Sequence, residues 1–179
     1  MSYEGEYGLA STQAKALRVS WKPQTSPPQY QVPTVSNVGQ VITYTDTASP
    51  SEHITVNMAT GEFTTVKKLK TATFLIAAQI GRASGGGIEE WGMYFEIFNG
   101  TTWEVADDST RYFTFRVSDT GDINHLSYTL AVSDLPKGMK FRLKQICSDA
   151  NDTVGILTSK PFVNAPLSAG IIVSVQTVG

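Results

Sequence analysis

The sequence predicts an all-β protein, an antiparallel β-sandwich of the jelly-roll kind behind an extended N-terminal arm. From His53 onward, roughly nine short segments alternate apolar and polar residues with the period of two that is typical of strands. Gly, Asn, Asp and Pro residues separate these segments at turn-like spacing. No segment with a helical period is long enough to predict a stable long helix.

Composition places the chain among ordinary globular proteins with one domain. The 179 residues are 41% hydrophobic, enough for a sizeable core, and only 17% charged. The formal net charge of −2 provides no general attraction to nucleic acid or to anionic lipid. A single cysteine, Cys147, excludes an intrachain disulfide.

The first residues and the hydropathy bear on where the protein is made. The start MSYEGEYG lacks the basic and apolar regions of a secretory signal peptide. No apolar run approaches the roughly 18 residues of a membrane span. We therefore expect synthesis in a cytoplasm and no membrane partner.

Residues 1–52 differ from the rest and predict an arm used for attachment. Residues 21–40 contain four prolines, each of which favours extended backbone, and residues 11–19 have the pattern of a short helix. Four large apolar side chains in the arm have no core of their own: Leu17, Trp21, Tyr30 and Val32. We expect them to anchor the arm on a partner. The alternative is that the arm folds back on its own sandwich.

Residues 53–179 form the predicted jelly-roll domain. Its strands are expected at 54–58, 60–66, 71–80, 91–98, 98–105, 111–118, 126–132, 139–146 and 169–178. The strand at 71–80 is apolar on both faces, which predicts burial on both sides. Asn99-Gly100 is a strong hairpin signal between two of these strands.

The glycine-rich stretch GRASGGG at 81–87 raises the possibility of a phosphate-binding loop. Such a loop ends in Lys followed by Ser or Thr and leads into a helix. This stretch has no such lysine, and a strand pattern follows it. The sequence therefore favours a turn between two strands.

Candidate catalytic and metal-binding groups are few and scattered. Two histidines, His53 and His125, and Cys147 provide no zinc motif. A Cys147–His125 nucleophile pair lacks any surrounding signature, and the acidic pairs Glu89-Glu90 and Asp107-Asp108 point to opposite faces of a strand. The oxygen-rich segment SDANDT (148–153) lacks the EF-hand spacing for calcium. We expect no enzyme activity, no cofactor and no metal.

Basic residues form two groups. Lys67, Lys68 and Lys70 are close in sequence, and the strand at 139–146 alternates Lys140, Arg142 and Lys144 on one face after Lys137. These groups are either contacts for an acidic partner or the solvated face of a sheet. Nucleic-acid binding requires a stronger positive charge with exposed aromatic residues, so we do not expect it.

The domain resembles the tumour-necrosis-factor-like and complement-globular-head jelly rolls. The segment TGEFTTVKKLKTATFLIAAQI (60–80) is similar to the opening of that family at Gly61, Phe63, Thr64, Phe74, Ile76 and Ala78. Lys137-Gly138 stands where the family has Gly-Asp, and APLSAGIIVSVQTVG (165–179) resembles its C-terminal strand.

The resemblance implies a non-catalytic homotrimer. In phages, jelly rolls of this kind decorate or cement the capsid, or form fibre tips, behind an attachment arm. We therefore expect a virion structural protein on the capsid surface, docked on the major capsid protein or another virion protein through its arm. The expected trimer interface includes Leu75, Tyr94, Phe98 and Ile172.

A receptor- or carbohydrate-binding head of a phage fibre or tail is the alternative function. The ligand would bind loops at Ser84–Glu90, Asp107–Arg111 and Ser148–Thr153. Trp91 and Trp103, near predicted strand ends, would stack on a sugar unless they fill the core.

Overall fold

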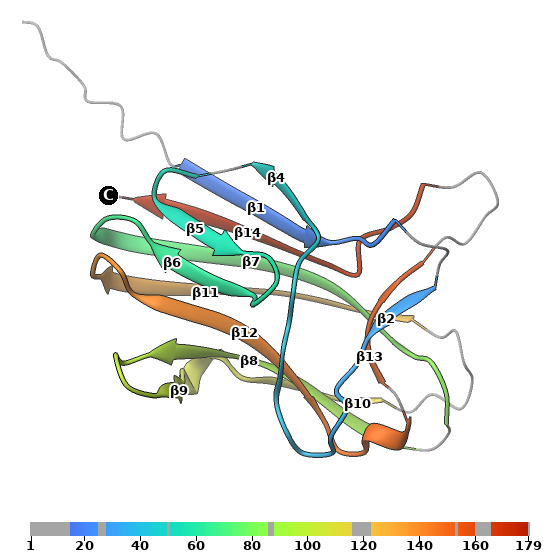
Figure 1. Cartoon of the computed structure of the whole chain (residues 1–179). Coiled ribbons are helices and arrows are strands. Elements are labelled where there is room, and N and C mark those ends of the chain that lie inside the picture. The colour runs from blue at the N-terminus through green and yellow to red at the C-terminus, as the bar shows by residue number, and fades with distance from the viewer. Residues whose placement is uncertain are drawn as a thin grey trace, which may run out of the picture.

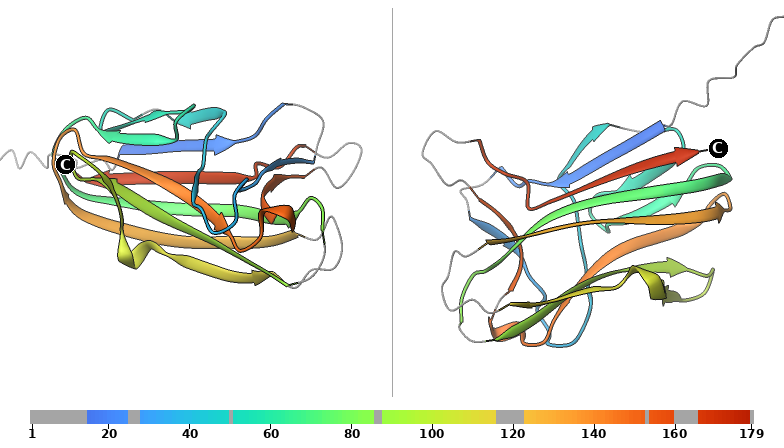
Figure 2. Two further views of the ribbon diagram at one scale, coloured as in Figure 1. Left: turned by 60° about the horizontal axis from the view of Figure 1, so that its bottom comes forward. Right: turned by 180° about the vertical axis from the view of Figure 1, so that it is seen from behind.

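The chain folds as two antiparallel β-sheets packed face to face, as Figures 1 and 2 show. The computed structural model describes residues 15–24, 28–49, 51–85, 88–115, 123–152, 154–159 and 166–178. Within these ranges there are fourteen strands and two short 3-10 helices, η1 (Asp107–Ser109) and η2 (Ala150–Asp152). The predicted all-β sandwich is confirmed. In these ranges no helix is long and apolar enough to cross a membrane.

The first sheet contains the long central strand of the fold. Its order is β2 (Gln29–Gln31), β13 (Val154–Thr158), β7 (Leu69–Arg82), β14 (Ile171–Val178), β1 (Lys15–Trp21) and β4 (Asp46–Ser49). On its other side, β7 pairs along nearly its whole length with β11 (Ile123–Leu135). β11 therefore forms one margin of this sheet.

The second sheet packs across the first. Its order is β10 (Arg111–Phe115), β8 (Glu89–Phe98), β12 (Lys140–Cys147), β6 (Glu62–Thr65) and β5 (Ile54–Asn57). Two short strands extend it, β3 (Gln40–Val41) beside β12 and β9 (Trp103–Val105) beside β8.

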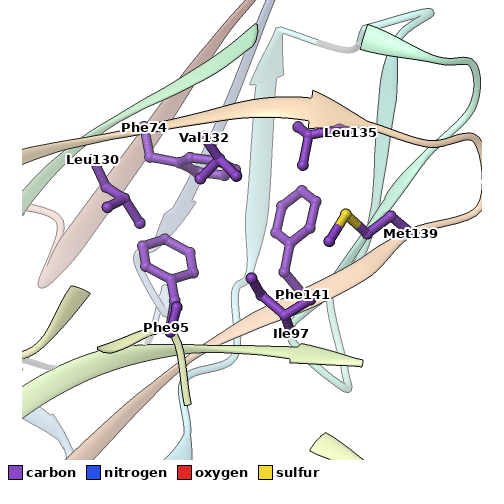
Figure 3. Close-up of a pocket in the computed structure, with 9 residues that line it drawn as sticks. Phe74, Phe95, Ile97, Leu130, Val132, Leu135, Met139 and Phe141 are labelled. Atoms are coloured by element: carbon purple, nitrogen blue, oxygen red, sulfur yellow. The ribbon is translucent and has the colours of Figure 1, made fainter. Parts of the chain in front are cut away.

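Aromatic rings fill the space between the sheets. Phe63 stacks on Phe141 with ring centroids 5.6 Å apart, and Phe74 lies 5.0 Å from Phe95. Packing is incomplete beneath β11, where an apolar cavity of about 20 Å³ remains (Figure 3). Its lining comes from both sheets and is wholly apolar: Phe74, Phe95, Ile97, Ala106, Leu130, Val132, Leu135, Met139 and Phe141. An apolar cavity of this size stays dry.

The N-terminal segment is part of the sandwich from residue 15 onward, which corrects the predicted arm and domain boundary. β1 is a strand, not the expected helix, and it pairs with β14 so that Leu17 lies opposite Val175. Leu17 and Trp21 are 2% and 8% exposed because they fill the core of their own chain. Residues 1–14 lie outside the described ranges.

A chain of buried amide groups holds the segment after β1 in place. The Trp91 indole donates to Gln145 Oε1 at 3.2 Å, and Gln145 Nε2 donates to the Gln31 carbonyl at 2.8 Å. Gln31 Oε1 then accepts from the Thr43 backbone N–H at 2.7 Å. Since unpaired buried polar groups are costly, these bonds fix β2 and the following segment against the second sheet.

Two predicted turns are confirmed. The Asn99-Gly100 hairpin joins β8 to β9, with Phe98 opposite Trp103 and Gly100 at a φ of 102°. Asn99 Oδ1 accepts from the backbone N–H groups of Thr101 and Thr102. The connection after Arg82 leads into the strand β8 and not into a helix, so it is not a phosphate-binding loop.

Candidate interaction surface

The outward face of the first sheet is free of charge over three adjacent strands. Here it is called the uncharged face. No Asp, Glu, Lys or Arg occurs among its members, which are Ile172, Ser174, Gln176 and Val178 of β14, Thr71, Thr73, Leu75, Ala77 and Gln79 of β7, and His125, Ser127, Thr129, Ala131 and Ser133 of β11. Solvated protein surfaces are ordinarily rich in charged residues, whereas the centres of protein interfaces are depleted of them.

Strand pairing places the apolar members of this face together. Leu75 lies between Ser174 and Thr129, and the neighbouring Ala77 lies opposite Ile172. Leu75 remains 39% exposed, although the sequence of β7 predicts burial on both sides. In the described ranges, therefore, no strand or helix covers the outward face of β7 at Leu75.

One end of the uncharged face forms an open depression of about 420 Å³. Ala77, Gln79, His125, Ser168 and Ile172 are among its lining residues. Gln79 is held there because its Nε2 donates to the Ala169 carbonyl at 2.7 Å. No Asp, Glu, Lys or Arg is among the residues that line this depression.

The β11 margin of the first sheet is a long edge strand. β11 has 13 residues, whereas β4, β10 and β5 at the other margins have 4, 5 and 4. Natural proteins protect long edges with charged side chains, prolines or bulges. The outward residues of β11 from His125 to Ser133 carry no Lys, Glu or Asp, whereas the exposed Asp134 interrupts the pairing at the C-terminal end of the strand with a φ of 54°. Between His125 and Ser133 this edge therefore lacks the protection that charged side chains give.

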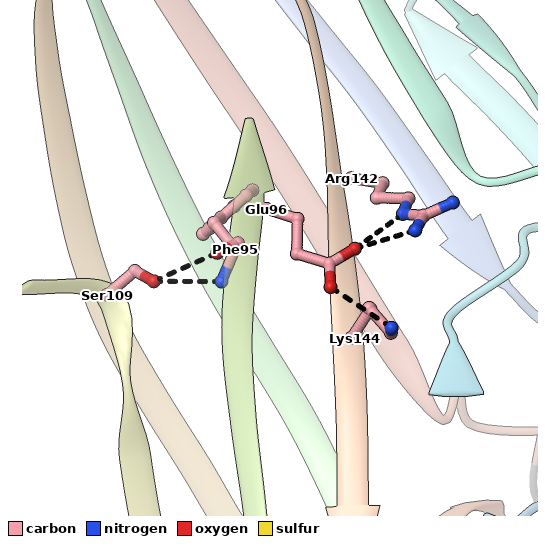
Figure 4. Close-up of polar contacts among 5 residues, drawn as sticks. All are labelled: Phe95, Glu96, Ser109, Arg142 and Lys144. Atoms are coloured by element: carbon pink, nitrogen blue, oxygen red, sulfur yellow. Dashed lines mark hydrogen bonds and ion pairs between the residues drawn. The ribbon is translucent and has the colours of Figure 1, made fainter. Parts of the chain in front are cut away.

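The outward face of the second sheet has the opposite character. Arg142 Nε and Nη2 both lie 2.7 Å from Glu96 Oε2, and Lys144 Nζ lies 3.1 Å from Glu96 Oε1 (Figure 4). The Arg142 guanidinium also lies over the Trp103 ring, 4.0 Å from its centroid. Beside this network, burial of the Tyr94 hydroxyl, with the neighbouring charge of Glu96, raises the pKa of Tyr94.

The residues predicted for the trimer interface divide between these two faces. Leu75 and Ile172 lie on the uncharged face, where Ile172 is paired with Ala77, two residues along β7 from Leu75. Tyr94 and Phe98 lie on the outward face of the second sheet, with Lys144 and Lys140 as their strand partners. These four side chains do not form one continuous surface. The alternation of apolar residues in the sequence predicts that these four side chains point away from the core, but it does not predict which sheet contains each of them.

The predicted ligand site also divides. Trp91 is fully buried and belongs to the core, which corrects its assignment to a ligand loop. Trp103 is partly exposed, with one ring face occupied by Arg142 and with Phe98 5.3 Å away. Two of the predicted ligand loops, 84–90 and 148–153, are in contact, because the Glu89 carboxylate accepts hydrogen bonds from Ser148 Oγ and the Asp149 N–H. The segment 107–111 lies further along β8, where Ser109 Oγ accepts from the Phe95 N–H at 2.8 Å.

The candidate arm anchors are integrated to different degrees. Leu17 and Trp21 are core residues, whereas Tyr30 and Val32 are half-buried beside β13. Gly155 of β13 permits this approach, since a Cβ there would lie 2.5 Å from the Gln31 carbonyl oxygen. For these four residues the described structure shows folding back on the same chain.

The two basic groups have different surroundings. Arg142 and Lys144 are paired with Glu96, and Lys140 lies 3.9 Å from Glu62. The other lysines of these groups, Lys67, Lys68, Lys70 and Lys137, are exposed. Thr65 Oγ1 donates to the Pro136 carbonyl at 2.6 Å, and this bond holds the turn with Lys137 beside the turn with Lys67 and Lys68. Within the described ranges these four lysines form no ion pair.

The described residues contain no cluster of three or more His, Cys, Asp or Glu side chains suited to a metal ion. His53 Nδ1 and Thr177 Oγ1 share a hydrogen bond of 2.7 Å. His125 lies opposite Gln79 in the first sheet, whereas Cys147 lies opposite Trp91 in the second sheet. Cys147 is buried, and burial, with the charges of Glu89 and Asp149, raises the pKa of its thiol to about 11. A thiol with this pKa is a weak nucleophile near neutral pH.

Comparison with solved structures defines the class of the fold. The sandwich is a jelly roll like that of tumour-necrosis-factor-like proteins. It is similar to Eiger TNF from S. frugiperda, with a TM-score of 0.58 and 11% identity over 93% of each chain. It is also similar to murine APRIL at pH 8.0, with a TM-score of 0.50 and 9% identity over 93% of this chain and all of that one. At such identities the likeness concerns the fold alone. No protein-family model matches the sequence, and no curated protein matches it.

Proposed function

We propose that this protein is a structural, non-enzymatic module that assembles as a homotrimer through its uncharged face. The observation that supports this proposal is the contrast between the two outward faces: one has a network of ion pairs, and the other has no charge over three strands. The resemblance of the sequence to tumour-necrosis-factor-like jelly rolls gives the expected number of subunits.

The long β11 edge provides the second half of the proposed contact. An edge that packs on the face of a neighbour is a heterologous contact, and heterologous contacts close into rings when the rotation permits. Such a ring would cover Leu75, Ile172 and the β11 edge together. It would give the two-sided burial of β7 that the sequence predicts.

The biological role in this proposal is decoration or cementing of a viral capsid. A trimer with three equivalent attachment points gains avidity without strong individual contacts. Leu17 and Trp21 belong to the core, so they do not serve as docking anchors. Attachment to the major capsid protein or another virion protein therefore uses other surfaces of the trimer.

The substitution Leu75→Lys tests the assembly. A lysine buried without a partner at an interface is strongly unfavourable, so the variant should be a folded monomer. Multi-angle light scattering measures this directly, with three times 19.4 kDa expected for the unmodified chain. Thr55→Lys, on the exposed outward side of β5, is the matched control and should leave the trimer intact. If the unmodified chain is a monomer by light scattering at every concentration, the proposed trimer is refuted.

The virion role has a separate test. Particles purified from the virus that encodes this chain should contain it in fixed proportion to the major capsid protein. The measurement is quantitative mass spectrometry of particles sedimented through a density gradient. If the chain remains at the top of the gradient, apart from the particles, the capsid role is wrong even if the trimer is right.

A further inference from the structure

The loop end of the second sheet exposes a group of large apolar side chains, here called the Tyr112 patch. Its exposed members are Val35, Val38, Ile88 and Tyr112, and the half-buried Tyr94 and Ile146 belong to the same outward side of the sheet. Ile88 and Tyr112 are each 68% exposed, Val35 55% and Val38 53%, which makes them the four most exposed large apolar residues in the described ranges. Large apolar groups that gather on a surface mark interaction sites, whereas scattered ones do not.

Strand register makes the centre of this patch continuous. Tyr112 lies opposite Gly92 in β8, and Gly92 lies opposite Ile146 in β12. The Tyr112 ring covers Gly92 closely, since a Cβ there would lie 2.4 Å from Tyr112 Cδ1. Tyr94 follows on the same side of β8, because successive outward residues of a strand are two apart.

Hydrogen bonds between loops extend the patch to the valines. The Asn37 N–H donates to the Cys147 carbonyl at 2.8 Å, and the Ser148 N–H donates to the Glu90 carbonyl at 2.9 Å. The loop with Val35 and Val38 and the segment with Ile88 thus lie on either side of Cys147-Ser148. The two valines close one turn, in which the Val38 N–H donates to the Val35 carbonyl at 3.3 Å. These bonds hold the patch in shape before any partner binds.

The position of the patch indicates which molecule covers it. It lies on the sheet opposite the uncharged face, at the loop end of the sandwich and away from the start of β1 (Figure 1). A trimer formed through the uncharged face covers the first sheet, whereas Tyr112 and Tyr94 lie on the outward side of the second sheet, so a different protein is the inferred occupant. This step rests on the proposed trimer.

The charge beside the patch restricts the partner further. Glu90 is exposed on the same side of β8 as Gly92 and Tyr94, and it forms no ion pair with any described residue. Lys144, at the other side, is already paired with Glu96. The geometry points to docking of a different protein, with an apolar side chain on Tyr112 and Ile146 and a Lys or Arg opposite Glu90. Tyrosine is enriched at the centres of interfaces, where it provides much of the binding energy.

A peptide library displayed on phage tests this inference with the full-length chain. Selection on the immobilised protein should enrich peptides that combine an aromatic or aliphatic residue with Lys or Arg. The affinity of a synthetic enriched peptide, measured by calorimetry, should fall at least tenfold with Tyr112→Ser and at least fivefold with Glu90→Gln. Thr55→Ser, on a distant strand of the same sheet, is the control and should bind as the unmodified chain does.

The outcomes separate this inference from the proposed trimer. If no peptide is enriched, or if enriched peptides bind Tyr112→Ser as well as the unmodified chain, the patch is not a docking site. If Tyr112→Ser lowers the mass by light scattering, the patch contacts a second copy and the inference is overturned. If Leu75→Lys is monomeric and still binds the peptide, both proposals hold. If the unmodified chain is a monomer but binds the peptide through Tyr112, the trimer fails alone.

Discussion

At the scale of single residues, Glu96 organises the charged face. Its carboxylate accepts from both Arg142 and Lys144, and the three side chains are only 10%, 20% and 15% exposed. Arg142 is held further by the ring of Trp103. Pairs in such partly buried positions are screened less by salt than pairs on an open surface. Two cations therefore depend on one carboxylate.

We predict that Glu96→Gln destabilises the fold by about 2 kcal/mol, because it leaves two partly buried cations without their counter-charge. Urea denaturation at neutral pH and fixed protein concentration measures the change. Glu62→Gln is the matched control. Its Lys140 partner is 45% exposed and 3.9 Å away, so the expected loss is about 0.5 kcal/mol or less. Equal losses in the two variants would show that burial does not strengthen the Glu96 network.

At the scale of the strand, β1 makes the N-terminal segment from residue 15 onward a part of the sandwich. It lies between β14 and β4, and Leu17, Val19 and Trp21 point into the core. A strand inside a sheet contributes backbone hydrogen bonds on both sides as well as apolar burial. Removing residues 1–52 would therefore remove part of the sandwich as well as any attachment segment.

We predict that Leu17→Ala lowers the free energy of unfolding by about 3 kcal/mol, the usual cost of a cavity left by a buried leucine. Ala16→Ser, at an exposed neighbouring position of β1, should change stability by about 0.5 kcal/mol or less. Both variants can be compared in urea at one protein concentration, since association would otherwise shift the transition. A Leu17→Ala variant as stable as the unmodified chain would restore the idea of an independent arm.

Most strands of residues 53–179 could be predicted because one-sided burial leaves a clear alternation. In β12, for example, Phe141 and Leu143 are buried while Lys140 and Arg142 are not. β13 was missed because Val154–Thr158 is buried at every position and short, so it has no alternation to detect. β1 was missed because Ala14 and Leu17 fit a helical spacing, although Leu17, Val19 and Trp21 also alternate as a strand does. The uncharged face could not be predicted, since it depends on which strands pair.

At the scale of the whole molecule, the two sheets present different surfaces to the surroundings. The first presents a three-strand face without Asp, Glu, Lys or Arg, and the second presents ion pairs and the Tyr112 patch. A chain with these two faces can associate with itself on one side and with a different protein on the other. In the proposed assembly, the distribution of charge between the sheets determines which face each partner covers.

This asymmetry predicts that self-association is insensitive to salt. Ion pairs between exposed groups weaken as the screening length falls from about 10 Å at 0.1 M salt to about 3 Å at 1 M. Contacts through Leu75, Ile172 and their small neighbours involve burial of apolar surface, which salt does not weaken. Sedimentation velocity should therefore give the same trimer mass at about 0.1 M and about 1 M sodium chloride.

Loss of the trimer mass at high salt would instead indicate that charged residues form the contact between subunits. A trimer that dissociates at high salt would be held by charged groups, and the exposed residues Lys67, Lys68, Lys70 and Lys137 would be the first candidates. Lys68→Glu distinguishes the two cases, because it lies outside the uncharged face. If self-association occurs through that face, this variant keeps the trimer mass at both salt concentrations, while Leu75→Lys loses it at both.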